Sequence, residues 1–169
     1  MKIVIIGHKN HGKGTFAHIL REFGLTCMGT SQFATPFMLE RLKDKVAYST
    51  PAECYADRDR FRPEWYEGLR EYNTPNPCQL IEDILAHNDA AEGLRHIDEY
   101  KPLRASGKVD LFIGIDASKR LPLESPKSMS LDVFKHADVI LSNNDSQENF
   151  EERARRFLTF LLAGKKHAI

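Results

Sequence analysis

The sequence predicts a single α/β domain in which a parallel β-sheet lies between layers of helices. Short apolar runs, KIVIIG at residues 2–7, VDLFIGID at 109–116 and ADVILSNN at 137–144, are typical of buried strands. Segments with the helical period alternate with them, and such alternation indicates parallel strands joined by right-handed crossovers. The length of 169 residues, without internal repeats or a linker, suits one domain over residues 1–169.

The first elements follow from local signals. The strand in KIVIIG precedes a helix from Lys13 to about Phe23. This helix carries an apolar stripe, and Gly24 fits its C-terminal end. LTCMG, ending at residue 29, is a candidate second strand. A helix is expected over residues 31–46, with a proline in its first turns. Residues 49–62 show no clear period, so no regular element is assigned there, and a helix is expected from about Pro63 to Tyr72.

Capping signals define the later helices. Asn76 is the expected N-cap of a helix that has a proline at its first position and reaches about His87. NDAAEGLR, residues 88–95, is ambiguous on its own. After the last strand, Asp145 and Glu148 form a capping-box pattern ahead of a final helix.

The composition is globular and limits the classes of function. Lys and Arg number 24 and so do Asp and Glu, so the formal net charge is zero. A dedicated duplex-binding protein usually carries a basic surplus, so the balance weighs against that class without excluding a local basic groove. No apolar run has the length of a membrane span or a signal peptide. Three widely spaced cysteines indicate a reducing compartment, so we expect a cytoplasmic protein without a membrane partner.

The strongest functional signal is GHKNHGKGT at residues 7–15. Gly7, Gly12 and Lys13 satisfy G-x-x-x-x-G-K, directly after a buried strand and before a helix, which is the context of a phosphate-binding loop. Glycines let backbone N–H groups turn toward phosphate oxygens, and the helix N-terminus adds partial positive charge. The expected donor-binding residues are Gly7, His8, Lys9, Asn10, His11, Gly12, Lys13, Gly14 and Thr15.

Two other interpretations of this stretch stay open. His8 and His11 are a candidate metal pair, but they lack the i, i+4 spacing of a helical zinc site, and no carboxylate stands nearby to complete a ligand set. A glycine-containing turn without a ligand is the second alternative. Pattern and context together favour phosphate binding, with both histidines in the loop and within reach of phosphate or acceptor.

GKGT at residues 12–15, with Gly14 in place of the usual Ser or Thr, resembles the nucleoside monophosphate kinase branch of P-loop proteins. RPEWYEGLREYNTPNP, EGLRHIDEY, VDLFIGIDASKRLPLESPKS and ADVILSNNDS resemble the phage deoxynucleoside monophosphate kinases and the related kinases that phosphorylate 5-hydroxymethyluracil in phage DNA. The last segment also resembles dephospho-coenzyme A kinase. The resemblance covers nearly the whole chain. It implies a three-layer P-loop kinase fold with five parallel strands ordered 2-3-1-4-5, an acceptor-binding region at about 30–88 and a lid at about 117–130.

The activity implied is transfer of the γ-phosphoryl group of ATP, with Mg²⁺, to a nucleotide. A deoxynucleoside monophosphate is the first expectation for the acceptor. The 5-hydroxymethyl group of a pyrimidine in DNA, as in thymidine hypermodification, is the alternative. A P-loop nucleotide switch and a non-catalytic nucleotide-binding module are further alternatives. A phage-encoded protein of this kind would act in the host cytoplasm, and the sequence leaves the oligomeric state open.

Two acidic positions are candidates for Mg²⁺, together with Thr15. Glu92 and Arg95 in EGLR resemble the D-G-x-P-R block of monophosphate kinases, which implies that the acid helps place Mg²⁺ through water and the arginine holds the acceptor phosphate. The alternative for Arg95 is a surface residue at a helix start. Asp116 ends an apolar strand in a Walker-B-like pattern. Its alternative is a cap of the following turn.

The later candidates belong to the lid and to the end of the last strand. Lys119 and Arg120 are expected to close over the phosphates and offset transition-state charge, against the alternative of an exposed basic loop. The side-chain amides of Asn143 and Asn144 are candidates for the adenine edge of ATP. They are equally suited to a turn and helix cap.

The charge cluster DRDRFR at residues 57–62 is by default a solvated run of ion pairs. Its arginines can instead hold an acceptor phosphate. One aspartate can instead act as a general base for a hydroxyl acceptor, whereas a phosphate acceptor is already ionised. The nearby Trp65, Tyr66 and Tyr72 are core residues or stacking platforms for a base. The candidates in the cluster are Asp57, Asp59, Arg58, Arg60 and Arg62.

Overall fold

The computed structural model describes residues 1–164 and contains one all-parallel five-stranded sheet. The strand order is β2-β3-β1-β4-β5, which confirms the order implied by the family resemblance. Ile3 in the central strand pairs with Ala90 on one side and Leu111 on the other. The strands are β1 (Ile3–Ile6), β2 (Cys27–Gly29), β3 (Ala90–Leu94), β4 (Leu111–Asp116) and β5 (Val139–Ser142).

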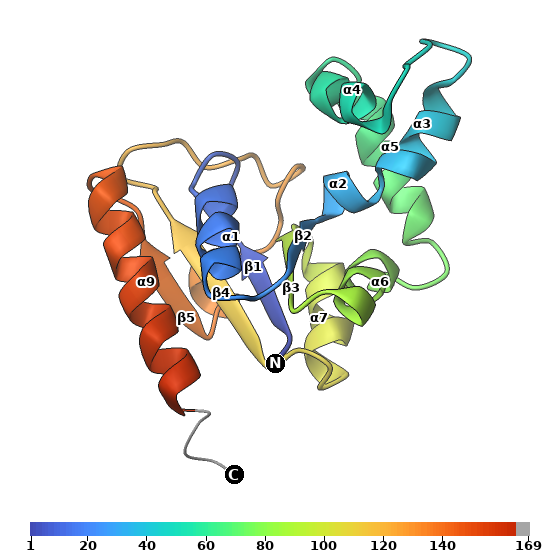
Figure 1. Ribbon diagram of the computed structural model, residues 1–169. Coiled ribbons are helices and arrows are strands. Elements are labelled where there is room, and N and C mark those ends of the chain that lie inside the picture. The colour runs from blue at the N-terminus through green and yellow to red at the C-terminus, as the bar shows by residue number, and fades with distance from the viewer. Residues whose placement is uncertain (165–169) are drawn as a thin grey trace.

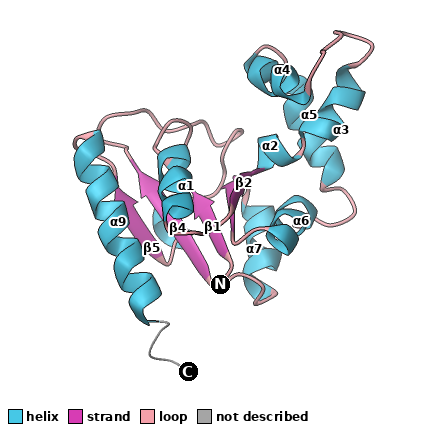
Figure 2. Cartoon of the chain, in the orientation of Figure 1, coloured by secondary structure: helices cyan, strands magenta, loops and turns pink. Residues whose placement is uncertain are grey.

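Helices cover both faces of this sheet, and Figures 1 and 2 show the resulting layers. The fold is therefore a three-layer α/β fold, as the sequence predicts. In the described part of the chain the helices are α1 (Lys13–Glu22), α2 (Thr30–Phe33), α3 (Thr35–Leu42), α4 (Pro51–Ala56), the 3₁₀ turn η1 (Asp57–Asp59), α5 (Arg62–Tyr72), α6 (Gln79–His87), α7 (Ile97–Ala105), α8 (Val133–His136) and α9 (Gln147–Ala163).

The central strand β1 explains why its sequence is apolar throughout. Side chains alternate between the faces of a strand, and here each face meets a different helix layer. Ile3 and Ile5 belong to a buried cluster with α1 and α9. Val4 and Ile6 belong to a second cluster with α6, α7 and α8. Both clusters fix the carboxyl end of β1, from which the loop at residues 7–12 leaves.

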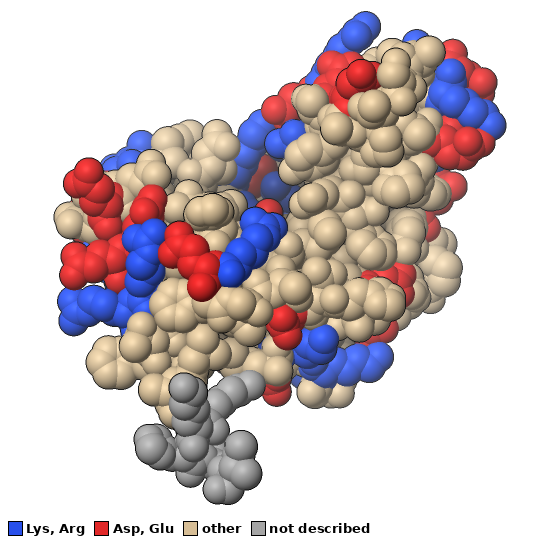
Figure 3. Space-filling view, viewed as in Figure 1, with Lys and Arg blue, Asp and Glu red and all other residues tan. Residues whose placement is uncertain are grey.

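Helices α2 to α5 form a lobe beside the β2 edge of the sheet (Figure 1). Its own small core contains Met38, Leu42, Cys54 and Trp65. Figure 3 shows Lys, Arg, Asp and Glu gathered where the lobe meets the body that carries the sheet. The lobe falls within the segment at about 30–88 that we expect to bind the acceptor.

Two expectations for the lobe are wrong. The helix expected over residues 31–46 is two helices, α2 and α3, which meet at Ala34. Pro36 lies in the first turn of α3 and has no N–H to donate back into α2, so the chain starts a new helix there. Residues 49–62, for which no element is expected, contain α4 and η1. The Thr50 side chain caps α4 by accepting a hydrogen bond from the Glu53 N–H.

Two expected caps are displaced. Asn76 does not cap α6; its Oδ1 accepts from the Cys78 N–H at 3.0 Å within a turn that precedes the helix. The N-cap of α9 is Ser146 rather than Asp145, because the Ser146 hydroxyl accepts from the Asn149 N–H while Asp145 pairs with Arg153. Neither α7 nor α8 is predicted by the patterns considered, and the ambiguous residues 88–95 contain β3.

The three cysteines, Cys27, Cys54 and Cys78, are free and buried. Over residues 1–164, no helix combines the length and the apolar character that crossing a bilayer requires.

Candidate active site

The loop between β1 and α1 has a conformation that needs glycine at residue 12. Gly12 has φ of 109°, and a Cβ there would lie 2.5 Å from Nδ2 of Asn143. Asn10 has φ of 65°, in the left-handed region. Gly14 faces open space, since a Cβ built on it meets no atom within 4 Å. The loop is therefore tightly packed on its β5 side and open on the side where α1 begins.

The open side carries backbone hydrogen-bond donors. The first backbone bond of α1 runs from the Phe16 N–H to the Gly12 carbonyl at 3.0 Å. Within residues 1–164, no acceptor lies in hydrogen-bond range of the N–H groups of Lys13, Gly14 and Thr15. Free N–H groups at a helix N-terminus, together with the helix dipole, favour an anion.

The Lys13 ammonium lies over this loop and is held by its carbonyls. It donates to Gly7 O at 2.8 Å and to His8 O at 2.7 Å. Burial, together with the positive charge of Arg95, lowers the pKa of Lys13 to about 8. An anion bound to the loop would supply the countercharge that this ammonium lacks.

His8 and His11 connect the loop to residues 117–130, the segment that the family resemblance implies is a lid. The buried His11 accepts from the Ala117 N–H at 3.1 Å, and His8 accepts from the Glu124 N–H at 3.0 Å, each through Nδ1. These bonds leave no pair of Nδ1 atoms free for one ion, and residues 1–164 contain no group of three or more His, Cys, Asp or Glu that could hold a metal. In this structure both histidines contact residues 117–130, and neither lines the cavity described next.

A cavity of about 1010 Å³ lies between the loop, the lobe, the end of β3 and the lid. Its cations greatly outnumber its acids, so it favours an anionic ligand. The cationic side chains that line it are Lys9, Lys13, Arg58, Arg62, Arg70, Arg95 and Lys127, and the acidic ones are Asp59, Glu92 and Glu99.

The cavity brings together many of the residues expected from the sequence and leaves others aside. The expected residues that line it are Lys9, Asn10, Gly12, Lys13, Gly14, Thr15, Arg58, Asp59, Arg62, Trp65, Glu92 and Arg95. Those that do not line it are Gly7, His8, His11, Asp57, Arg60, Asp116, Lys119, Arg120, Asn143 and Asn144.

The two candidate bases of the charge cluster have different surroundings. Asp57 accepts from the Tyr48 hydroxyl at 2.8 Å and pairs with Arg60 at 3.6 Å, away from the cavity. Asp59 accepts from the Lys9 ammonium at 3.1 Å at the mouth of the cavity, and its side chain is 65% exposed. The hydrogen bond from Lys9 lowers the pKa of Asp59, so this carboxylate is ionised at neutral pH. The geometry favours Asp59 over Asp57 for any contact with an acceptor.

The candidates at the ends of β4 and β5 form an internal network. Asp116 is buried and accepts from the Asn144 side-chain amide at 2.6 Å and from the Ser118 N–H at 3.0 Å. Burial alone would raise the pKa of Asp116, but these hydrogen bonds hold it below its usual value. Asn144 Oδ1 also accepts from the Lys119 N–H. These groups thus connect the base of the lid to β5.

Asn143 completes this network. Its Nδ2 donates to the His11 carbonyl at 2.9 Å, and its own carbonyl accepts from Arg120 Nε at 2.8 Å. Asn143 therefore supports the loop, and the Arg120 guanidinium lies against the end of β5 instead of over the cavity.

Two residues of the site, Arg70 and Glu124, are not selected by the sequence analysis, whereas Arg62, Trp65 and Tyr66 are. Arg62, Tyr66 and Arg70 are spaced by four along α5 and line the cavity, so helical periodicity is the signal that predicts Arg70. Trp65 is 4% exposed and belongs to the core of the lobe, yet it lines the cavity and its Nε1 has no partner in the described structure. Glu124 lies within SKRLPLESPK, and no pattern in that segment marks it.

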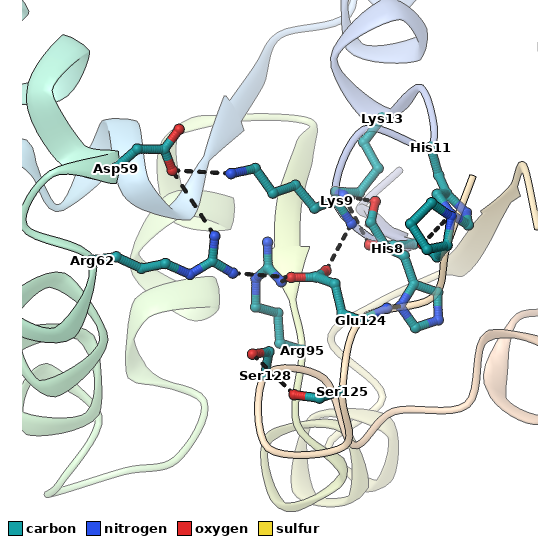
Figure 4. Close-up of polar contacts among 12 residues, drawn as sticks. His8, Lys9, His11, Lys13, Asp59, Arg62, Arg95, Glu124, Ser125 and Ser128 are labelled. Carbon is teal, nitrogen blue, oxygen red and sulfur yellow. Dashed lines mark hydrogen bonds and ion pairs between the residues drawn. The ribbon is translucent and has the colours of Figure 1, made fainter.

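Glu124 is the point where the site residues converge, as Figure 4 shows. Arg95 Nη1 donates to both of its carboxylate oxygens, at 2.9 and 2.8 Å. Arg62 Nη2 lies 3.3 Å from Oε1, and the Lys9 N–H donates to Oε2 at 2.7 Å. The β3 end, the lobe, the loop and the lid therefore meet at one carboxylate.

No family model matches this sequence, and neither does any curated protein. Among solved structures, a shikimate kinase from Bacteroides thetaiotaomicron is similar with a TM-score of 0.51 and 11% identity, over 95% of this chain and 98% of that one. A gluconokinase from Sinorhizobium meliloti 1021 is similar with a TM-score of 0.50 and 13% identity, over 98% and 97% of the two chains. At these identities the likeness shows the fold alone, so the chain has the three-layer fold of P-loop kinases.

Proposed function

We propose that the chain is an ATP-dependent phosphotransferase whose acceptor is a deoxynucleoside monophosphate. The observation that carries the proposal is the position of the loop: its free N–H groups and Lys13 open onto the same cavity as Arg58, Arg62 and Arg95. Donor and acceptor phosphates would therefore meet at one place. A cavity of about 1010 Å³ accommodates a nucleotide, and guanidinium groups are suited to bidentate phosphate binding.

Each part of the site has a distinct proposed role. The N–H groups at the start of α1 and the Lys13 ammonium would bind the donor phosphates, and Arg95 would bind the acceptor phosphate. Thr15 and Glu92 line the cavity beside the loop and suit the placement of Mg²⁺, which binds through few protein oxygens and retains waters. Mg²⁺, when bound, neutralises charge on the phosphate oxygens. Lys119 and Arg120 could contribute only after the lid moves, because neither lines the cavity.

A hydroxymethyl pyrimidine in DNA is the second candidate acceptor, and Asp59 is the observation that favours it. An alcohol benefits from a nearby base, which a phosphate acceptor does not need. Asp59 is an ionised carboxylate at the cavity mouth, within 3.1 Å of Lys9. The exposed Tyr66 lines the same cavity and could stack on an extruded base.

Transfer of labelled phosphate separates these candidates. ATP labelled at the γ position would be incubated with each of the four common deoxynucleoside monophosphates, and separately with DNA that contains 5-hydroxymethyluracil. We expect label on a free nucleotide. Label on the polymer alone would establish the second candidate. Label found only in inorganic phosphate, or label that stays entirely on ATP, would contradict both candidate acceptors.

The lowered pKa of Lys13 predicts how donor use depends on pH. Lys13 binds phosphate as an ammonium, and its pKa of about 8 means that the free protein loses this proton as the pH rises through 8. We therefore expect kcat/KM for ATP to be constant below this pH and to decrease about tenfold per pH unit above it. A pH profile of kcat/KM at saturating acceptor checks the prediction. A flat profile from pH 7 to 10 would contradict it.

A further inference from the structure

A carboxylate of the chain itself is bound by three residues that line the cavity, Lys9, Arg62 and Arg95. Glu124 accepts from Arg95, from Arg62 and from the Lys9 N–H, at 2.7 to 3.3 Å, and its side chain is only 11% exposed. Burial alone would raise its pKa, but Arg95 and the Lys9 N–H hold the pKa of Glu124 below its usual value. Glu124 is therefore an anion at neutral pH.

The donors that hold Glu124 come from both sides of the proposed reaction. Lys9 is the third residue of the donor loop, whereas Arg95 follows β3 and Arg62 begins the acceptor-side helix α5. A phosphoryl oxygen placed between donor and acceptor would need these same groups. A phosphate dianion carries more charge and more acceptor oxygens than a carboxylate, so it competes favourably for guanidinium and N–H donors.

We propose that Glu124 stands in for a phosphoryl group and latches the lid over the cavity until a substrate phosphate displaces it. The identity of the displacing ligand rests on the proposed function: it is either the γ-phosphate of ATP or the phosphate of the acceptor. Both present the same chemistry to the three donors. The latch itself depends only on the contacts of Glu124.

Displacement of the carboxylate has a consequence for the lid. The Glu124 N–H also donates to His8 at 3.0 Å, so backbone and side chain of one residue attach the lid to the donor loop. When a phosphate takes Arg95 and the Lys9 N–H, the carboxylate keeps only its contact with Arg62 and faces a like charge. The second attachment, at His8, would then break with the first. Phosphate binding and release of the lid are thus coupled.

The latch reduces the apparent affinity for phosphate-bearing ligands. The apparent binding constant is the intrinsic one multiplied by the fraction of molecules in which the donors are free. A latch that is closed about nine-tenths of the time therefore weakens binding about tenfold. Glu124→Gln keeps the size of the side chain and removes the charge that competes with phosphate. We expect about tenfold tighter binding of phosphate-bearing ligands by this variant, and unchanged binding of their counterparts that lack the phosphate.

Paired probes identify which phosphate enters the subsite. Fluorescence of Trp65, the single tryptophan, would follow titration with AMP-PNP against ADP, and with each deoxynucleoside monophosphate against its deoxynucleoside. A gain with AMP-PNP alone assigns the subsite to the γ-phosphate. A gain with the monophosphates alone assigns it to the acceptor phosphate. Either result, or both, supports the latch.

Asp59→Asn is the matched control for loss of charge. Asp59 also borders the cavity and contacts Lys9 and Arg62, but it binds neither Arg95 nor the Lys9 N–H. We expect this variant to show less than a twofold gain. An equal gain in affinity in both variants would mean that loss of any negative charge at the cavity has this effect, and it would overturn the latch. No gain in affinity in Glu124→Gln would overturn it as well.

Hydrogen exchange in the unmodified protein tests the latch without any substitution, so a folding defect in a variant cannot affect the result. The Glu124 amide should exchange up to about tenfold faster when a phosphate-bearing ligand saturates the site, because its bond to His8 opens with the lid. Unchanged or slower exchange at Glu124 would overturn the proposal. These binding measurements do not require turnover. A protein that shows the gain and the faster exchange but no phosphoryl transfer would keep the latch and lose the proposed function.

Discussion

Lys13→Ala is expected to reduce phosphoryl transfer by at least about a thousandfold, the largest effect of any single substitution in this site. The ammonium lies over the loop, 2.8 Å from Gly7 O and 2.7 Å from His8 O. It would stabilise charge on the moving phosphoryl group, and an alanine side chain carries no charge that could replace it. Initial rates with saturating ATP and acceptor measure the loss.

Stability separates this loss from unfolding. Burial lowers the pKa of Lys13 to about 8, which means that the fold disfavours the charged form at pH 7. Removing the ammonium should therefore leave the melting temperature equal to or above that of the unmodified protein. Lys108→Ala is a matched control, because Lys108 pairs with Glu82 on the surface. A Lys13→Ala variant with more than a tenth of the original rate would contradict the assignment of the loop.

Arg95→Ala is expected to lower kcat/KM for the acceptor by about a hundredfold to a thousandfold. Arg95 follows β3 and lines the cavity, and its guanidinium donates two hydrogen bonds to Glu124. The acceptor phosphate would take over that guanidinium. The KM for ATP should change much less, because the loop and Lys13 remain.

Two further variants sharpen this result. Arg95→Lys keeps the charge but loses the planar fork, so it should recover only part of the activity. Arg104→Ala removes an arginine that pairs with Asp138 outside the cavity and should leave kcat/KM for the acceptor unchanged. Equal losses for ATP and acceptor in Arg95→Ala would contradict an acceptor-side role.

The central strand and the loop that follows it could be predicted from the sequence because both depend on short-range patterns. The apolar run Ile3–Ile6 is buried on both faces, which requires apolar side chains at every position. Gly12 and Lys13 lie in a fixed relation to the end of that strand and the start of α1. The strand order came from the family resemblance, since nothing in the local pattern determines which strands become neighbours.

The centre of the site could not be predicted, because it depends on contacts between segments far apart in the chain. Glu124 contacts Lys9, Arg62 and Arg95, and none of these is near it in sequence. For His8 the sequence indicated a role, but a contact with a distant segment determines its surroundings. Its spacing suggested a ligand or a metal, but the fold places the lid backbone against it.

The helices of the lobe show a different limit. Thr50 and Glu53 have the spacing of a capping box, yet the charged stretch that follows obscured this signal and α4 was not expected. The break between α2 and α3 depends on Pro36. A proline is also common in the first turn of an ordinary helix, so the pattern alone does not show that a second helix starts there.

A crystal structure with AMP-PNP and Mg²⁺ tests the central claim most directly, that the loop at residues 7–15 binds the phosphates of ATP. The account predicts phosphate oxygens within about 3 Å of the N–H groups of Lys13, Gly14 and Thr15. It also predicts that the Lys13 ammonium leaves the carbonyls of Gly7 and His8 to contact the phosphates. A nucleotide bound elsewhere with this loop unchanged, or a metal ion held by both His8 and His11, would contradict it.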